Sequence, residues 1–459
     1  MFNAQTYVER RNRLGALLGS GLLLFLGNEE SSMNYTDNTY PFRQDSSFLY
    51  FFGLDRPGCA AVMDLDQGRT VLFGDDLTLD DIVWTGFQPT LAELAQGAGV
   101  LATAPLAELP AMLAKADGRP VQFLPPYRPE HRLKLRKLLG LLPEFQDAAA
   151  SRPFLRAVIE LRAIKHDEEI AELERAVDVT VAMHLAAMRM AKPGIREADL
   201  AAKVTEIALA SGGALSYPVI GTIHGETLHN HSYGNTLQSG QMYLLDAGAE
   251  TASHYAGDLT STCPVDRDFT PRQRGVYDVV LRTHLHALSL LKPGVPFREV
   301  HLSACRTMVE GLKELGLMQG DPAEAVAQGA HAMFFQCGLG HMLGLDVHDM
   351  ENLGEVWVGY EGQPKSTQFG LKSLRLARPL QPGFVLTVEP GIYIIPELIR
   401  RWKAEGKFSG FINYPKLESY ADFSGIRLEE NVLITADGCR ILGKWRPRTA
   451  EEIAKVRAD

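Results

Sequence analysis

Four carboxylates and one imidazole inside apolar or glycine-rich runs constrain the fold of this chain more than any other feature. They are Asp246 in MYLLDAGAE, Asp258 in YAGDLTSTCP, His341 in CGLGHMLGLDVHD, Glu389 in FVLTVEPGIY and Glu429 in SGIRLEENV. A buried carboxylate is costly unless a positive group neutralises it, and no local lysine or arginine is spaced to neutralise all four. Two divalent cations would cancel the four charges. The pattern therefore predicts a two-metal hydrolase, whose oxygen-rich ligands suit Mn²⁺, with Co²⁺ or Zn²⁺ as alternatives.

Size and charge narrow the class of protein further. The 459 residues exceed one ordinary hydrophobic core, so two domains are expected. A net charge of -10 argues against nucleic acid or an anionic membrane as a partner. The cysteines have no CxxC spacing and are odd in number, which is typical of a reducing cytosol: Cys59, Cys263, Cys305, Cys337 and Cys439.

The N-terminal segment imitates a secretory signal, because Arg10, Arg11 and Arg13 precede the apolar run LGALLGSGLLLFLG. Glu9 lies among the arginines, glycines interrupt the run, and no small-residue cleavage site follows. A helix, a turn and a buried strand are the simpler prediction. No apolar run approaches the roughly 20 residues of a transmembrane helix, and the expected location is cytoplasmic.

Strands and helices alternate over residues 1–155, which predicts an α/β domain. Strands are expected at 21–27, 59–66, 69–74 and 120–125, and helices at 91–99 and 109–116. Residues 156–459 form the second predicted domain. It begins with one helical stretch over 158–194 and continues as two strand-rich runs separated by helices. Two polar segments, 351–370 and 396–424, are predicted to be loops that cover the site.

Each metal-ligand candidate has an ordinary alternative when it is taken alone. Asp246 and Asp258 are twelve residues apart on a predicted hairpin, and either could be a turn or cap residue. Glu389 precedes a proline, which places its carboxylate at the tip of a strand. Arg427 and Glu429 are expected on one strand face, where they could form a simple ion pair. Five such residues together make separate explanations improbable.

These motifs resemble the pita-bread metallopeptidases, specifically the aminopeptidase P and prolidase branch. Upstream, YPFRQDSSFLYFFGL resembles the N-terminal domain of aminopeptidase P, and LRAIKHDEEI resembles the interdomain helix of that family. The resemblance implies a creatinase-like α/β domain over 1–155 and an α+β pita-bread catalytic domain over 156–459. It also implies two metal ions per subunit, usually Mn²⁺, and a homo-oligomer, either a dimer or a tetramer.

The resemblance further assigns roles to the metal ligands. Asp258 and Glu429 would bridge the two ions, Asp246 would hold one of them, and His341 and Glu389 would hold the other. A water between the ions would attack the scissile carbonyl, with Glu389 as the proton shuttle.

Other residues match positions around the substrate in the family. His229 and His348 match active-site histidines, and His348 is expected to donate to the oxyanion or to a nearby carbonyl. Arg375 aligns with an arginine that receives the substrate carboxylate, although it could also be a surface charge. Arg427 is expected to orient a bridging carboxylate. Cys337 stands where the family usually has a histidine, so contacts beyond the cleaved bond are in doubt, while His224 and His231 are interpreted as loop histidines.

The implied substrates are short proline-containing peptides cleaved at the Xaa-Pro bond. The N-terminal motif favours an Xaa-Pro aminopeptidase, whereas LKSLRLARPLQPGFVLTVEPGIY and the segment after Pro396 resemble an Xaa-Pro dipeptidase (prolidase). A catalytically inactive pita-bread binding protein is a third hypothesis, but it predicts missing ligands or a charged tail. A methionine aminopeptidase would not explain the N-terminal motifs, and metal-free hydrolysis of the creatinase type does not explain the full ligand set.

Overall fold

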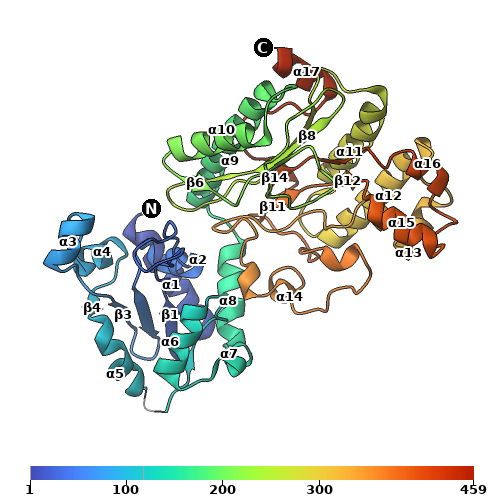
Figure 1. Ribbon diagram of the computed structural model, residues 1–459. Coiled ribbons are helices and arrows are strands. Elements are labelled where there is room, and N and C mark those ends of the chain that lie inside the picture. The colour runs from blue at the N-terminus through green and yellow to red at the C-terminus, as the bar shows by residue number, and fades with distance from the viewer. Residues whose placement is uncertain (1, 117, 459) are drawn as a thin grey trace. The chain divides into compact units, whose positions relative to one another are not determined.

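The computed structural model describes residues 2–116 and 118–458 and divides into two compact units. Unit 1 comprises Met1–Arg162 and Met350–Gly354, and unit 2 comprises Ala163–Asp349 and Glu355–Asp459. The predicted boundary after residue 155 falls inside helix α8 (Arg152–Ala163) (Figure 1). Most of this helix lies with unit 1, because the Phe154 ring lies 5.1 Å from that of Phe25 and the Tyr50 hydroxyl donates to the Leu161 carbonyl.

Unit 1 is built on one five-stranded sheet in the order β4-β3-β2-β1-β5. Its strands are β1 (Leu22–Leu26), β2 (Ala60–Asp64), β3 (Arg69–Phe73), β4 (Ala102–Ala104) and β5 (Val121–Gln122). The helices are α1 (Ala4–Leu18), α2 (Ser46–Phe52), α3 (Leu79–Thr85), α4 (Leu91–Gly97), α5 (Leu109–Ala114), α6 (Pro129–Leu139), α7 (Pro143–Ala149) and α8. The four predicted strands and two predicted helices are confirmed, while the short edge strand β4 was not predicted.

The arginine-rich N-terminal segment is part of the fold of unit 1. Arg10 and Arg11 are buried on α1, and their guanidinium groups donate to the carbonyls of Tyr50 and Phe51 at 3.0 and 2.7 Å. The apolar run that follows forms β1, which pairs with both β2 and β5. The prediction of a helix, a turn and a buried strand is therefore confirmed. Over residues 2–116 and 118–458, no helix combines the length and apolar character required to cross a bilayer.

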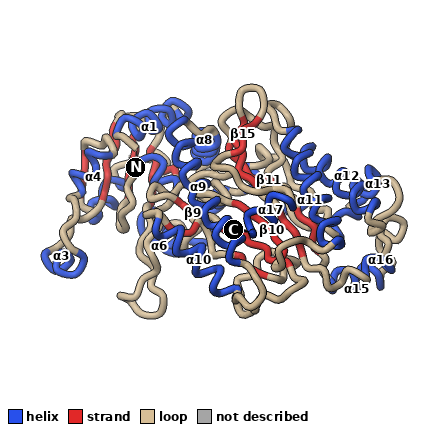
Figure 2. Tube along the Cα trace, turned by 90° about the horizontal axis from the view of Figure 1, so that it is seen from above, coloured by secondary structure: helices blue, strands red, loops and turns tan. Residues whose placement is uncertain are grey.

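Unit 2 contains two three-stranded sheets, in the orders β10-β8-β7 and β11-β14-β15, together with two smaller strand pairs, β12-β13 and β6-β9. The strands are β6 (Ala214–Leu215), β7 (Ile220–Thr222), β8 (Met242–Ala247), β9 (Ala249–Glu250), β10 (Leu259–Pro264), β11 (Val385–Val388), β12 (Gly391–Tyr393), β13 (Gly425–Arg427), β14 (Glu430–Ile434) and β15 (Cys439–Ile441). Helices α9 (Asp167–Met190), α10 (Glu197–Ala210), α11 (Pro271–Leu290), α12 (Phe297–Glu314) and α17 (Ala450–Ala458) lie around these strands (Figure 2). The prediction of two strand-rich runs separated by helices is confirmed.

The helical stretch predicted over 158–194 is two helices, which corrects the expectation of one. Helix α8 ends at Ala163 and α9 begins at Asp167, where the Glu169 carboxylate accepts a hydrogen bond from the His166 amide at 3.1 Å. Between them Lys165 turns inward and pairs with Asp349 at 2.8 Å, with both side chains 1% exposed. The break between the two helices thus coincides with the residue that forms this buried ion pair.

Segment 396–424 does not form a loop over the site, so this expectation was wrong. It contains α15 (Pro396–Ala404) and α16 (Tyr414–Glu418), and Trp402 and Leu417 are buried. Ile412 forms a β-bridge with Met318. The apolar residues of this segment add a packed layer to unit 2. The polar overall composition of the segment did not predict this layer. The remaining short elements of unit 2 are α13 (Pro322–Gln328), α14 (Glu355–Val358) and the 3-10 turns η2 (Ala330–Met333) and η4 (Leu371–Ser373). The 3-10 turn η3 (Glu351–Leu353) belongs to unit 1.

Candidate metal centre

The hairpin predicted around the two aspartates is present. Strands β8 and β10 are antiparallel, with Asp246 opposite Thr260, and Asp258 directly precedes β10. The backbone of Asp258 is fixed by the Asn431 side chain, which accepts from the Asp258 amide at 2.9 Å. The Tyr217 hydroxyl lies 2.5 Å from a carboxylate oxygen of each aspartate. Strand pairing therefore brings two residues that are twelve positions apart to the same place.

A second part of the site is formed where the glycine-rich segment around His341 lies along β11. The His341 amide donates to the Thr387 hydroxyl at 3.1 Å, and the Glu389 amide donates to the Leu339 carbonyl at 2.8 Å. Gly340 makes this approach possible, because a Cβ there would lie 2.0 Å from the Thr387 carbonyl oxygen. Glu389 follows the last residue of β11, as predicted from the proline after it.

Glu429 lies between two strands, which corrects the prediction that it shares a strand face with Arg427. Strand β13 ends at Arg427 and pairs with β12, whereas β14 begins at Glu430 and pairs with β11. At this change of partner the Glu429 amide donates to the Thr260 carbonyl at 3.1 Å. The break turns the Glu429 carboxylate toward the β8–β10 hairpin, where Thr260 donates to it at 2.7 Å.

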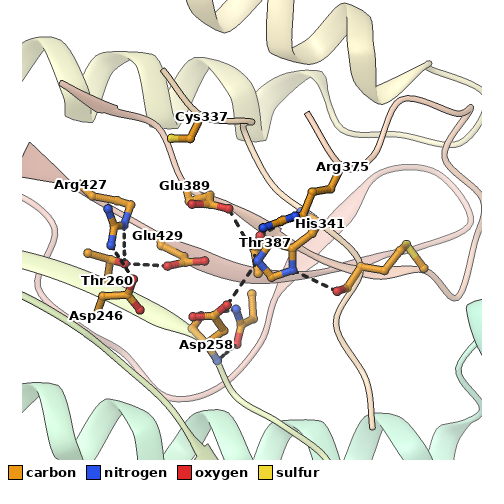
Figure 3. A network of polar contacts seen from close by, with 12 residues as sticks. Asp246, Asp258, Thr260, Cys337, His341, Arg375, Thr387, Glu389, Arg427 and Glu429 are labelled. Carbon is orange, nitrogen blue, oxygen red and sulfur yellow. Dashed lines mark hydrogen bonds and ion pairs between the residues drawn. The ribbon is translucent and has the colours of Figure 1, made fainter. Parts of the chain in front are cut away.

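The five predicted ligands converge on one cavity of about 410 Å³, which all of them line. Figure 3 shows their side chains pointing toward a common space from β8, β10, β11 and the segments beside them. His341 Nε2 lies 3.4 Å from an Asp258 oxygen and 3.6 Å from a Glu389 oxygen. One donor atom each from Asp258, His341 and Glu429 lies within 4.8 Å of the other two. The tertiary structure thus joins residues that are spread over 184 positions of the sequence.

The hydrogen bonds of His341 fit a metal ligand. Its Nδ1 lies 3.1 Å from the Met342 carbonyl, which can only accept, so Nδ1 carries the proton. In a neutral ring Nε2 is then an acceptor, yet it faces carboxylate oxygens that are acceptors as well. A proton or a cation between these atoms resolves the conflict, and a ring N–H held by a carbonyl is the usual arrangement of a metal-bound histidine.

The electrostatics of the cavity indicate missing positive charge. Burial and the neighbouring carboxylates raise the pKa of Glu429 well above its ordinary value, and burial raises the pKa of Glu389 to about 7. Burial also raises the pKa of Asp246, although Arg427 opposes this shift. In contrast, the interaction with the His341 ring holds the pKa of Asp258 below its ordinary value despite burial. Four carboxylates and one imidazole that share such a cavity fit two divalent cations with oxygen-rich ligation.

Arg427 pairs directly with Asp246, at 2.5 Å, and reaches Glu429 only through Thr260. Its Nε donates at 3.0 Å to the Thr260 hydroxyl, which in turn donates to Glu429. A further nitrogen donates to the Tyr393 hydroxyl at 2.9 Å. A single buried arginine therefore orients two of the carboxylates but leaves most of their charge uncompensated.

The other predicted site residues also line the cavity: His229, His348, Arg375 and Cys337. The His348 and His341 rings are 4.2 Å apart in an edge-on arrangement. Burial lowers the pKa of His229, so this ring is neutral near pH 7. Burial raises the pKa of the Cys337 thiol to about 12, and the thiol lies 3.9 Å from the Tyr393 hydroxyl.

Arg375 is not an isolated surface charge, because it reaches the cavity and contacts an acidic partner. Its Nη1 lies 2.6 Å from a Glu355 oxygen, and Lys365 contacts the other oxygen of the same carboxylate. The helix surface considered as an alternative place for Arg375 is also absent at this position, since η4 ends at Ser373.

Sequence reasoning missed several residues of the site. His224 and His231 both lie outside helices and strands, as predicted, but His231 also lines the cavity, whereas His224 lines another pocket. Tyr217 and Thr260 hold the carboxylates, but neither has a distinctive motif. For Thr260 a signal did exist, since it is two residues after Asp258 on the same predicted strand face.

Two family models match the chain. The model "Metallopeptidase family M24" matches residues 171–436, and "Aminopeptidase P, N-terminal domain" matches residues 7–121. The chain belongs to the M24 metallopeptidase family. The predicted fold, a creatinase-like α/β domain followed by an α+β pita-bread domain, and its place in the aminopeptidase P and prolidase branch are thereby confirmed.

Individual relatives cover nearly the whole of this M24 chain. The Xaa-Pro dipeptidase of Homo sapiens is 32% identical over 463 residues, which span 98% of the chain and 91% of the relative. The Xaa-Pro aminopeptidase of Escherichia coli (strain K12) is 33% identical over 470 residues, spanning 98% and 96%. The structure of "Zn substituted E. coli Aminopeptidase P in complex with product" covers 100% of this chain and 98% of its own, with 31% identity and a TM-score of 0.83.

Proposed function

We propose that this M24 protein is a dinuclear-metal exopeptidase that hydrolyses the Xaa-Pro bond at the N-terminus of peptides, an Xaa-Pro aminopeptidase. One observation carries the proposal: all five candidate ligands line the same cavity as His229, His348 and Arg375. Relatives named Xaa-Pro aminopeptidase and Xaa-Pro dipeptidase support the prolyl substrate. The proposal includes Mn²⁺ as the metal, a cytoplasmic location, a homo-oligomer, and catalytic and N-terminal domains over 156–459 and 1–155.

The proposed ligands are Asp258 and Glu429 as bridges, Asp246 on one side, and His341 and Glu389 on the other. When bound, two divalent ions would supply a water that ionises near neutral pH and would polarise the scissile carbonyl. Glu389 is the proposed proton carrier, because its carboxylate lines the cavity beside the other ligands. His348 and His229 would donate to or orient the substrate carbonyls.

Specificity for proline would come from the cavity wall, because the amide nitrogen of an Xaa-Pro bond carries no hydrogen to donate. Leu228, Ile220 and Val347 provide apolar surface in the same cavity. Cys337 is a weak hydrogen-bond donor compared with the usual histidine of the family. We therefore expect contacts to the residue after the cleaved bond to rely more on shape than on a charged hydrogen bond.

An Xaa-Pro dipeptidase is the second candidate, and the position of Arg375 favours it. This guanidinium lies in the cavity wall, where it could receive the carboxylate of a dipeptide. Its contact with Glu355 argues the other way, because the paired charge is partly neutralised before any substrate arrives. The pairing is the reason we place the aminopeptidase first.

Peptide length decides between the two activities. Protein stripped of metal and reloaded with Mn²⁺ should release the first residue from Gly-Pro, Ala-Pro and Arg-Pro-Pro, measured as free amino acids by chromatography. Arg-Ala-Ala is the matched control and should remain intact. Cleavage of the dipeptides alone would identify a dipeptidase, and cleavage of none of the prolyl peptides would refute both candidates.

A further inference from the structure

A second cluster of metal-binding side chains lies in unit 2, outside the carboxylate cavity. His301 and Cys305 are one helical turn apart on α12, and His331 lies in η2. One donor atom from each residue lies within 4.8 Å of the other two. The three residues are 1%, 0% and 1% exposed, and none of them is among those that line the carboxylate cavity.

The imidazoles of this cluster have unused nitrogen atoms. Within the described residues, His301 Nδ1 and both ring nitrogens of His331 lack a hydrogen-bond partner. A buried polar atom without a hydrogen-bond partner destabilises the fold. Phe335 packs against the His301 ring at 5.7 Å and offers no acceptor. Packing alone therefore leaves both nitrogens of His331 without a partner among the described residues, and a bound ion would occupy one of them.

The distances in the cluster fit a tetrahedral zinc site. Cys305 Sγ lies 3.6 Å from His301 Nε2. Ligands at the usual Zn–N and Zn–S lengths, with tetrahedral angles, place nitrogen and sulfur about 3.6 Å apart. The His301 and His331 rings meet at 70° with centroids 6.5 Å apart, so they do not stack and both can aim a nitrogen at one point.

We propose that His301, Cys305 and His331 bind a zinc ion, separate from the catalytic metals, that ties α12 to the segment leading into the active site. One thiolate and two imidazoles select zinc over manganese, which prefers oxygen ligands. Burial favours neutral imidazoles, the form that coordinates, and the Cys305 thiol would lose its proton to solvent on binding. The zinc ion would hold in place the loop that contains Cys337 and His341, because η2 ends four residues before Cys337.

Water can complete the tetrahedral coordination of this three-residue site.

Cobalt spectroscopy distinguishes this site from the catalytic centre. The metal-free full-length protein is first loaded with Mn²⁺ and then titrated with Co²⁺ while the near-ultraviolet absorbance is followed. We expect a thiolate-to-cobalt charge-transfer band that saturates at about one equivalent and that Zn²⁺ abolishes. The proposed carboxylate centre contains no thiolate ligand, so cobalt bound there gives no such band.

Cysteine variants assign the band. The variant C305S should lose the charge-transfer band. The control variant C59S removes a buried thiol of unit 1 and should keep the band at full strength. The absence of a band in the wild-type protein, or its persistence in C305S, would overturn the proposal.

Stability gives a second readout. In protein whose carboxylate centre is saturated with Mn²⁺, added zinc should raise the melting temperature of the wild type more than that of C305S. A melting temperature that does not respond to zinc would contradict the tie. Neither readout uses peptidase activity, so failure of the proposed function and failure of the zinc site are distinguishable.

Discussion

Asp64 in unit 1 and Glu429 in unit 2 are both buried carboxylates, 4% and 2% exposed, but they have opposite electrostatic surroundings. Arg119 donates to both oxygens of Asp64, at 2.8 and 3.0 Å, and these hydrogen bonds lower the pKa of that carboxyl. Glu429 has a hydrogen bond from Thr260 and faces Asp258, Glu389 and Asp246, and its pKa is raised.

The comparison shows two ways in which a protein can bury negative charge. In unit 1 an arginine of the chain neutralises the carboxylate, so the pair contributes to the fold without help. In unit 2 the chain gathers more negative charge than Arg427 compensates and leaves a cavity of about 410 Å³ beside it. Uncompensated charge of this kind marks a functional site, because it costs stability that only a ligand recovers.

The largest expected effect comes from removing a carboxylate of unit 2. Substitution Glu429→Gln should lower kcat/KM for an Xaa-Pro peptide by about a thousandfold or more, because a metal ligand contributes several kcal/mol to transition-state stabilisation. Steady-state kinetics at saturating Mn²⁺ measure the loss.

The same variant should gain stability when metal is absent. The raised pKa of Glu429 means that the wild-type carboxylate destabilises the metal-free fold above about pH 4.3, its ordinary value, and increasingly so as the pH rises. The gain should therefore be small near pH 4 and reach roughly 2–4 °C in melting temperature near pH 8. A metal-free variant that melts below the wild type at pH 8 would contradict our view that this charge is uncompensated.

An intermediate effect is expected when Arg427 is changed to lysine. The lysine keeps the charge but cannot contact Asp246, Thr260 and Tyr393 together. Affinity for Mn²⁺, measured by calorimetry, should fall about 10–100-fold, the usual cost of losing a residue that orients metal ligands. Arg119→Lys in unit 1 is the matched control and should leave the affinity for Mn²⁺ unchanged. Equal losses of affinity in both variants would contradict a role of Arg427 in orienting the metal ligands.

The smallest effect is expected for a variant in unit 1, and its change in stability has the opposite sign to that of Glu429→Gln. Substitution Asp64→Asn should destabilise unit 1 at pH 7 and leave kcat/KM within about twofold, because Asp64 lies outside the cavity. The lowered pKa means that the stabilisation is complete above about pH 3.9, the ordinary value of an aspartate, and disappears as the pH falls through the folded-state pKa.

Amide hydrogen exchange in β2 measures this difference for unit 1 alone, at pH 7 and at pH 3. The gap between wild type and Asp64→Asn should narrow at the lower pH. A gap of the same size at both values would mean that the charge of Asp64 contributes nothing, and the contrast between the two units would fail.

Much of the fold could be predicted because its signals are local. The run LLLFL forms β1, and Pro390 places Glu389 at the end of β11, since each feature depends on residues that are neighbours in the chain. The break at Lys165 could not be predicted, because its partner Asp349 lies 184 residues away. Helices α15 and α16 were missed because their apolar residues are few and become buried only against distant segments.

The sequence by itself determined which residues are the proposed metal ligands, because carboxylates within apolar runs are costly to bury without a compensating role. Only the tertiary structure decided how they meet. Strand β13 ends at Arg427 and β14 begins at Glu430, and this change of partner turns Glu429 toward Asp258 while Arg427 pairs with Asp246. Tertiary structure also decides that the imidazoles of His301 and His331 lie together. These residues are thirty positions apart, and helix packing rather than a local sequence pattern makes them neighbours.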